Sequence, residues 1–410
     1  MPVAKGDTTA LLASNSARVL TEIRRRGGAA RIDLAEALEL SPATVTAIVA
    51  DLLQNGLVRE KDTVTTSGRG RPRRLLALNP EAGYVAGAKL NTGFLTVAVL
   101  DFVGDVIADA KAPVPGPTVN PQEMLESLMK AFDAVLQKAG LTKDQILGFG
   151  MGVPGFIERD SGLCHWSPVL RGAPLNVREL LQTRIACPVS VDNDANLATL
   201  AELWFGHGRF HRDFLVVTIE HGVGLGVVID GRLYRGTRGL GAEFGHLKVQ
   251  MDGALCRCGQ RGCLEAYVAD FAIVREAGAA FPGVAVPGDA SQLISMLAER
   301  ARAGEAVPAS IFRRAGRMLG LGLANLLNLF DPSLIVLTGA RMHNHGLLME
   351  GVEKSILDNS LSTERPNVRL EVHRWGDSLW ARGAGALALE TMNIPFHEGA
   401  VLEQKIPCRD

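Results

Sequence analysis

The segment GHLKVQMDGALCRCGQRGCLEAY, residues 245–267, places one imidazole and three thiols close together in the chain. Its candidate metal ligands are His246, Cys256, Cys258 and Cys263. Three soft thiolates and one imidazole make a complete tetrahedral set for Zn²⁺, and four protein ligands leave no open position for a substrate. The spacing therefore predicts a structural zinc site. The alternative is three buried free cysteines beside an unrelated histidine.

The rest of the composition is that of an ordinary folded protein. The chain has 410 residues, of which 47% are hydrophobic and 21% charged, with a formal net charge of −1. This length predicts two or three domains, and six cysteines are too few for a disulfide scaffold. No apolar run approaches the roughly 20 residues of a membrane span. The N-terminal residues lack an apolar signal segment, so we expect a cytoplasmic protein without a membrane partner.

The first 80 residues differ in charge from the rest, because they carry 12 Lys and Arg against 8 Asp and Glu. Residues 14–80 predict three helices followed by a two-stranded hairpin. The third helix begins at Ser41-Pro42, a capping hydroxyl followed by a proline at the first helical position. It ends near Asn55-Gly56. This order is that of a winged helix-turn-helix, whose third helix enters the major groove of DNA.

The residues expected to contact DNA fall into two groups. Small uncharged side chains at the start of the third helix could approach base edges closely, although they lack the bidentate contact of Arg or Asn. They are Ser41, Ala43, Thr44 and Thr46. Arginines flanked by glycines in the predicted wing could enter a minor groove and attract phosphates. They are Arg69, Arg71 and Arg73, in the run SGRGRPRR at residues 67–74. The alternative for this run is a solvated linker.

Beyond residue 80, strands alternate with helices, which indicates an α/β architecture. Helices are expected at about 121–139, 195–205 and 309–329, among strands that include 146–155 and a hairpin at 214–234. An early and a late pair of strands suggest two similar halves. The glycine-rich turn inside the second hairpin is by itself only a weak signal for phosphate binding.

Several of these segments together resemble the ROK family of repressors, open reading frames and kinases. They are the cysteine segment, GVPG at 152–155, VDNDAN at 191–196 and, in the head, LSPATVTAIVADLLQNGLV followed by GRGRPRRLLALNP. The resemblance extends over nearly all of residues 14–390. It implies a two-lobed, actin-like ATPase and sugar-kinase fold preceded by the winged helix-turn-helix. The expected domains are a DNA-binding head at 1–80, a first α/β lobe at 81–195 and a second at 196–410. The second would carry the zinc loop, and its C-terminal helix would return to the first lobe.

The resemblance also implies a sugar site in the cleft between the lobes. The residues at the family's sugar-hydroxyl positions are Asn193, Asp194, Glu243, His246 and Glu265. Carboxylates and an amide offer directional hydrogen-bond partners to a ring of hydroxyls, and zinc would hold His246 and Glu265 in place. Asp194 matches the catalytic base of the family's kinases. Each acid taken alone could equally be a surface ion-pair partner.

Two segments depart from the phosphate loops of the family's kinases. Where the kinases have D-x-G-G-T, this chain reads Lys89-Leu90-Asn91-Thr92-Gly93. Where they have G-T-G-x-G, it reads Glu220-His221-Gly222-Val223-Gly224. A lysine replaces the acid expected near magnesium, and Glu220 places negative charge where phosphates would lie. We therefore expect no catalytic residue and no enzyme activity, with Asp194 as a vestigial base in a retained sugar site.

These observations favour a sugar-responsive DNA-binding transcriptional regulator, and we expect a repressor of carbohydrate-utilisation genes. Its expected partners are double-stranded operator DNA, a sugar or sugar derivative, and further copies of the chain in a homodimer or a higher homo-oligomer. A homodimer is expected because paired heads on paired half-sites bind more tightly. Two alternatives remain open. One is an active ATP-dependent sugar kinase carrying a DNA-binding head, and the other is a scaffold that binds a protein instead of a sugar.

Overall fold

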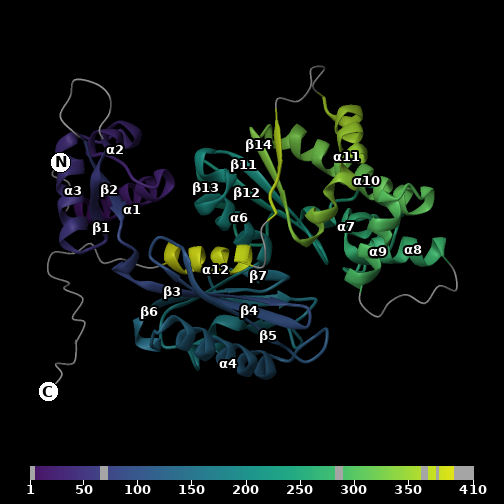
Figure 1. The fold of residues 1–410 in the computed structure, drawn as a ribbon, viewed down its shortest axis with the longest axis horizontal. Coiled ribbons are helices and arrows are strands. Elements are labelled where there is room, and N and C mark those ends of the chain that lie inside the picture. Colours follow the sequence, from purple (N-terminus) through teal and green to yellow (C-terminus); the bar gives the residue numbers. More distant parts are fainter. Residues whose placement is uncertain (1–4, 65–72, 282–289, 362–367, 375–377, 392–410) are drawn as a thin grey trace.

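A computed structural model of the chain describes residues 5–64, 73–281, 290–361, 368–374 and 378–391. A small helical head lies at one end, and two five-stranded sheets with their covering helices form the body (Figure 1). The α/β architecture expected from the sequence is confirmed. None of the described helices combines the length and the apolar character needed to cross a membrane.

The head contains the three helices and the hairpin that the sequence predicts. They are α1 (Lys5–Arg26), α2 (Arg31–Leu38), α3 (Pro42–Gln54), β1 (Val58–Val64) and β2 (Arg73–Leu78). The Ser41 hydroxyl caps α3 by accepting a hydrogen bond from the Thr44 amide at 3.1 Å. Buried Val45, Ile48 and Leu52 form the inner face of α3. The strands β1 and β2 pair antiparallel, as in a wing. The candidate wing residues Arg69 and Arg71 lie outside the described residues.

The two body sheets have the same strand plan. The first has the order β10-β6-β3-β4-β5 and the second the order β15-β14-β11-β12-β13. In each, an antiparallel meander is extended by two parallel strands. The first comprises β3 (Tyr84–Asn91), β4 (Phe94–Asp101), β5 (Val106–Pro113), β6 (Ile146–Gly152) and β10 (Val189–Asp192). The second comprises β11 (Phe214–Ile219), β12 (Val223–Ile229), β13 (Arg232–Tyr234), β14 (Leu334–Thr338) and β15 (Arg369–Val372). The two similar halves expected from the sequence are therefore present.

Helices cover both sheets and bury their apolar side chains against them. On the first sheet these are α4 (Pro121–Ala139) on one side and α12 (Ser378–Thr391) on the other (Figure 1). One face of the second sheet packs on α6 (Asp194–Phe205). The other face packs on a group of helices. That group consists of α7 (Glu265–Val268), α8 (Asp270–Ala280), α9 (Ala290–Arg302), α10 (Ala306–Phe330) and α11 (His345–Asn359). The predicted helices at 121–139, 195–205 and 309–329 are thus confirmed.

The helix α12 lies between the two sheets and contacts both the first sheet and α6 (Figure 1). It approaches β6 so closely that a Cβ added at Gly150 would lie 1.9 Å from the Ala384 carbonyl oxygen. A Cβ at Gly383 would likewise lie 2.0 Å from the Leu197 carbonyl oxygen of α6. The last described helix is therefore the packing element between the halves.

A small third sheet, absent from the sequence-based expectations, follows β6. It consists of β7 (Phe156–Glu158), β8 (Leu163–Trp166) and β9 (Leu175–Asn176), and the short helix α5 (Val177–Gln182) comes next. Its strands are too short to show a clear alternation of apolar and polar residues.

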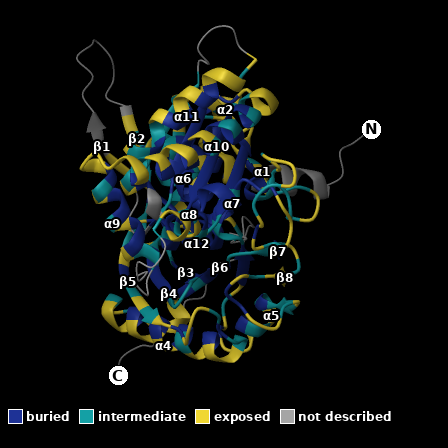
Figure 2. Cartoon of the chain, turned by 90° about the vertical axis from the view of Figure 1, so that its right-hand side faces the viewer, coloured by how far each residue is buried: buried dark blue, intermediate teal, exposed yellow. Residues whose placement is uncertain are grey.

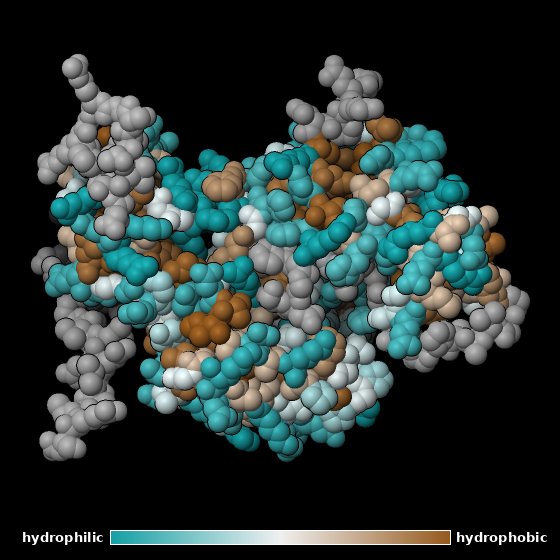
Figure 3. All heavy atoms as spheres, viewed as in Figure 1, coloured by the Kyte–Doolittle hydropathy of each residue, from teal (hydrophilic) through white to brown (hydrophobic). Residues whose placement is uncertain are grey.

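The buried residues concentrate along the sheets and the central helices, while the outward faces of α2, α4 and α11 are exposed (Figure 2). On the face seen in Figure 3, hydrophilic side chains cover most of the surface and hydrophobic ones gather in separate groups.

The ends of α10 and α11 expose four large apolar side chains, Leu329, Phe330, Leu357 and Leu361. Side-chain hydrogen bonds of Asn328 to Asn359 and Leu361 hold these two helix ends together. Exposed apolar groups of this kind are typical of surfaces that a partner covers.

Candidate sugar and metal site

The four candidate metal ligands meet in one cluster, although the first cysteine lies ten positions after His246. His246 ends a single turn of 3₁₀ helix, and the following loop folds back on itself through a bridge between Lys248 and Cys263. Gly262 has a φ of 79°, and a Cβ there would lie 1.9 Å from the Gln250 carbonyl oxygen. Only glycine permits this close return of the backbone.

The geometry of the cluster suits one tetrahedral metal ion. The ligand atoms of His246, Cys256, Cys258 and Cys263 all lie within 4.8 Å of one another. The Cys258 and Cys263 sulfurs are 3.7 Å apart, and the Cys256 sulfur is 3.8 Å from Nδ1 of His246. Sulfurs bound tetrahedrally at about 2.3 Å from one zinc ion would be about 3.8 Å apart. These residues can therefore hold a metal ion without a large rearrangement.

The electrostatic surroundings also favour a cation in this cluster. Burial raises the pKa of the Cys256 thiol well above its usual range, and a bound cation would offset this effect by favouring the thiolate. Nζ of Lys248 lies 3.0 Å from the Cys263 sulfur and 2.5 Å from Oε1 of Gln260. Its ammonium would stabilise the negative charge that several thiolates bring.

The candidate sugar residues come from three places in the fold. Asn193 caps α6, with Oδ1 accepting a hydrogen bond from the Asn196 amide at 2.8 Å, and Asp194 is the first residue of that helix. Glu243 precedes the 3₁₀ turn that ends at His246. Glu265 begins α7, two residues after the metal-ligand candidate Cys263.

Contacts join Glu265 to the metal cluster, and electrostatic interactions join Glu243 to Glu265 and Asp194. Oε1 of Glu265 lies 3.6 Å from the Cys256 sulfur, and its Oε2 accepts a hydrogen bond from the Val223 amide at 3.2 Å. Glu243 is exposed, yet the protein atoms around its carboxyl, followed by the charges of Asp194 and Glu265, raise its pKa to about 7. The acids of the predicted sugar site thus lie close enough to interact, beside the metal cluster.

Aromatic rings also lie near His246. The ring of Phe156 in β7 is 6.1 Å from the His246 ring and 5.3 Å from the ring of Trp166 in β8. The sequence reasoning did not select either aromatic residue. The only signal was their position after the GVPG segment, in strands too short to be recognised.

The sequence reasoning identified Lys89 and Glu220 as departures from phosphate loops, but it did not foresee that they pair. Lys89 is 1% exposed, and its Nζ lies 3.3 Å from Oε2 of Glu220 and 3.7 Å from Oδ2 of Asp194. The same Nζ lies 3.5 Å from the centroid of the Trp380 ring in α12. A lysine inside the apolar strand VAGAKLN was the signal that a buried partner was needed.

The candidate DNA-binding residues lie far along the chain from this site, in the head. Ser41, Ala43 and Thr46 are exposed at the start of α3, and Thr44 is half-buried. The hydroxyls of Ser41 and Thr44 are hydrogen-bonded to each other at 2.8 Å. Arg73 is the first residue of β2.

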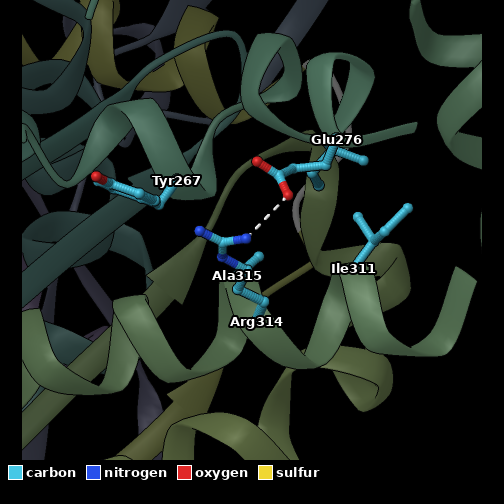
Figure 4. A pocket seen from close by; sticks show the side chains of 6 residues that line it. Tyr267, Glu276, Ile311, Arg314 and Ala315 are labelled. Atoms are coloured by element: carbon cyan, nitrogen blue, oxygen red, sulfur yellow. Dashed lines mark hydrogen bonds and ion pairs between the residues drawn. The ribbon is translucent and has the colours of Figure 1, made fainter. Parts of the chain in front are cut away.

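Within the described residues, two hollows lie away from the candidate sugar residues. One, of about 10 Å³, is lined by Tyr267, Ile273, Glu276, Ile311, Arg314 and Ala315, with Arg314 and Glu276 paired at 3.2 Å (Figure 4). It is just large enough for a single water. The other, of about 430 Å³, is lined by Arg159, Asp160, Arg178, Gln182, Pro188, Val189, Ser190 and Thr391. Neither is lined by the candidate sugar residues.

The chain matches known regulators over most of its length. It is 28% identical over 405 residues to the xylose repressor of Caldicellulosiruptor bescii, covering 96% of this chain and 100% of that one. It is 29% identical over 388 residues to the DNA-binding transcriptional dual regulator NagC of Escherichia coli, covering 92% and 93%.

Solved structures show the same relationship. A ROK family transcriptional regulator, described as a homolog of the E. coli MLC protein, matches with a TM-score of 0.77 and 27% identity over 92% of this chain and 96% of that one. A ROK family glucokinase from Streptomyces griseus, in complex with glucose and AMPPNP, matches with a TM-score of 0.66 and 29% identity over 75% and 100%. Residues 12–63 match the MarR family model, and residues 92–391 match the ROK family model. The chain therefore belongs to the ROK family and carries a MarR-type winged helix domain at its head.

Proposed function

We propose that this protein is a sugar-responsive transcriptional repressor of carbohydrate-utilisation genes, in which the head binds DNA and the body binds a sugar. The observation that carries the proposal is the electrostatic interaction of Glu243 with Asp194 and Glu265, the last of which contacts the metal cluster, in a chain that also has a winged helix head. Carboxylates grouped in this way can accept hydrogen bonds from several sugar hydroxyls. Relatives of nearly full length are named xylose repressor and N-acetylglucosamine repressor, which supports this function.

We propose that Asn193, Asp194, Glu243, His246 and Glu265 bind the sugar between a first lobe at 81–195 and a second at 196–410. The metal cluster of His246, Cys256, Cys258 and Cys263 would hold zinc as a structural ion. Because Cys256 contacts Glu265, and His246 is itself a ligand, the ion would fix two sugar-binding side chains. The ion has no catalytic part in this proposal, since four protein ligands close its coordination sphere.

We propose that the head, residues 1–80, reads operator DNA as part of a homodimer. Ser41, Ala43, Thr44 and Thr46 would lie at the major groove, while Arg69, Arg71 and Arg73 would contact phosphates or the minor groove. The exposed apolar ends of α10 and α11 offer one surface that a second copy could cover. Sugar acts on DNA binding only if it binds one arrangement of the two heads more tightly than the other.

An active sugar kinase is the second candidate, because the chain also resembles a glucokinase whose structure holds glucose and AMPPNP. The Lys89–Glu220 pair speaks against it. Glu220 lies on the turn that would have to accept phosphates, and its negative charge is held there by a buried ammonium. We therefore propose that the protein has no kinase activity.

A thermal-shift screen of the purified protein would test these alternatives. The panel would hold neutral monosaccharides, N-acetyl sugars and their phosphates, each with and without Mg-ATP. A ligand at about 100 times its Kd adds roughly 2.7 kcal/mol of stability, which is readily measured. A response to one sugar and none to Mg-ATP, followed by a change in DNA affinity with that sugar, would support the repressor. A response to Mg-ATP with sugar phosphorylation would establish the kinase instead.

A further inference from the structure

The larger of the two hollows, of about 430 Å³, lies where four parts of the fold meet. Its walls come from the loop after β7, from α5, from the start of β10 and from Thr391, the last residue of α12. This volume is in the range of small-molecule binding sites. Apart from Pro188 and Val189, every lining residue has a charged or hydrogen-bonding side chain. The lining therefore suits a polar ligand.

One wall of the hollow carries Arg178 of α5 in a fixed position. Its Nη1 donates a hydrogen bond to the Asp160 carbonyl oxygen at 2.6 Å, and its Nη2 donates to the Arg159 carbonyl oxygen. The backbone at Gly162 packs on the same side chain, since a Cβ added there would lie 2.4 Å from Cβ of Arg178. These hydrogen bonds use two of the five guanidinium N–H groups. Both acceptors are uncharged, and no carboxylate of the described residues pairs with Arg178.

The second arginine of the hollow, Arg159, has a shared counterion. Its Nη2 lies 3.3 Å from Oε2 of Glu390, and the same oxygen lies 3.0 Å from Nη2 of Arg235. Arg235 is also paired with Asp192 at 2.8 Å. Three guanidinium groups thus stand against two carboxylates in this connected set, once Arg178 is included. The positive charge of the two lining arginines is only partly compensated.

Both arginines also have hydrogen-bond donors to spare. Within the part of the chain that the structure describes, the Nε groups of Arg159 and Arg178 are buried and have no acceptor. Buried donors are normally satisfied by protein, water or an ion, because leaving them unpaired is unfavourable. A guanidinium matches the geometry of a carboxylate or a phosphate. The Asp160 carboxylate opposes an anion less than its position suggests, because Asp160 is exposed and water screens its charge.

We propose that this hollow binds a small organic anion, whose carboxylate or phosphate group is held by Arg159 and Arg178, at a site separate from the sugar site. The Ser190 hydroxyl of β10 and the Thr391 hydroxyl of α12 also line it and are hydrogen-bonded to each other at 2.9 Å. A bound anion would therefore contact the first sheet and the helix that packs between the halves. The regulator would gain a second effector, and this inference does not depend on sugar binding.

The test is titration calorimetry with three anions at constant ionic strength. The probes are inorganic phosphate, 3-phosphoglycerate and citrate, so that a preference for phosphate can be distinguished from a preference for carboxylate. Pro188 is exposed at the hollow, which allows a charge to be added there without disturbing the core. The proteins are the wild type, Arg178→Gln, Pro188→Glu, Pro188→Gln and Arg184→Gln, a control at an exposed arginine outside the lining.

We expect the wild type to bind at least one of the probes at a single saturable site at millimolar concentration. Arg178→Gln should weaken this binding at least about tenfold, because a charge-assisted hydrogen bond is lost. Pro188→Glu should also weaken it, since the added carboxylate repels the anion, whereas the uncharged Pro188→Gln should not. Arg184→Gln should bind as the wild type does.

Three results would overturn the proposal. The first is the absence of saturable binding of every probe to the wild type. The second is equal affinity of the wild type and a folded Arg178→Gln. The third is equal affinity of Pro188→Glu and Pro188→Gln, which would place the bound anion elsewhere. If Arg178→Gln does not fold, the two variants at Pro188 decide the question.

Discussion

The guanidinium of Arg24, in the last turn of α1, lies 4.4 Å from the centroid of the Trp204 ring near the end of α6. Nη2 of Arg24 also donates a hydrogen bond to the Phe102 carbonyl oxygen at 2.9 Å. Burial lowers the pKa of Arg24 to about 10. The DNA-binding head is thus joined directly to the helix whose other end carries Asp194.

A second arginine reinforces this junction from the body side. Arg209 follows α6 and donates hydrogen bonds through Nη2 to the carbonyl oxygens of Arg24 and Arg25, at 3.1 Å and 2.7 Å. Carbonyls at the end of a helix lack partners within the helix and attract cations. The end of α1 is therefore fixed to the residues that follow α6, and a shift of α6 on sugar binding would reach the head.

The first prediction concerns this junction. Arg24→Gln removes the cation–π contact, and we expect it to destabilise the protein by about 2 kcal/mol. We further expect the ligand to change DNA affinity less than in the wild type, because the head is less firmly tied to α6. The measurements are urea denaturation and DNA binding with and without the sugar. Arg18→Gln, at an exposed arginine that bonds within the head, is the control. Unchanged coupling in Arg24→Gln would contradict this role.

The second prediction concerns the metal cluster. Protein purified under reducing conditions should contain about one zinc ion per chain. His246→Ala and Cys258→Ser should lose the ion and several kcal/mol of stability, because metal binding contributes directly to folding. Metal analysis and thermal unfolding with and without a chelator would measure both effects. Cys187→Ser, at a cysteine outside the cluster, should keep the ion. A metal-free wild type whose melting is unaffected by His246→Ala would show the interpretation to be wrong.

The third prediction concerns the wing. The double change Arg69→Ala with Arg71→Ala should weaken binding to a DNA site selected from a random pool. It should reduce the slope of log affinity against log salt concentration by about 2 if both residues contact phosphates. If the two arginines act only on DNA, thermal stability should stay within about 0.5 kcal/mol of the wild type. Ser41→Ala should instead cost about 1 kcal/mol, because the cap of α3 is lost. An unchanged salt slope would leave the wing arginines without a role at phosphates.

The fourth prediction concerns the packing of α12. Gly150→Ala should destabilise the protein by about 2 kcal/mol or more, since its new methyl group would lie 1.9 Å from the Ala384 carbonyl oxygen. Gly278→Ala is the matched control, because an added Cβ in α8 meets no atom within 4 Å. We expect Gly278→Ala to be slightly more stable than the wild type, because alanine has a higher helix propensity than glycine. Equal stability of the two variants would argue against close packing of α12 on β6.

The parts of the fold that could be predicted are those encoded by nearby residues. The cap at Ser41, the apolar spacing in α3 and the spacing of the cysteines each act over fewer than twenty residues. The pairing of Lys89 with Glu220 spans 131 residues, and no local pattern shows which turn a buried lysine will meet. The same reason applies to Arg24 and Trp204, whose contact exists only after the head has packed on the body. The strands β7 and β8 escaped recognition because each has at most four residues.

The position of α12 has a consequence for the order in which the protein becomes folded during its synthesis. Residues 84–152 of the first sheet leave the ribosome long before residues 378–391, yet they need this helix to cover one face. Ala381, Ala388 and Leu389 also belong to the same apolar core as Val19 and Leu76 of the head. A nascent chain must therefore carry an uncovered apolar sheet until residues 378–391 have been made, a state in which aggregation competes with folding. We expect the DNA-reading head to reach its final packing only after residues 378–391 have been made.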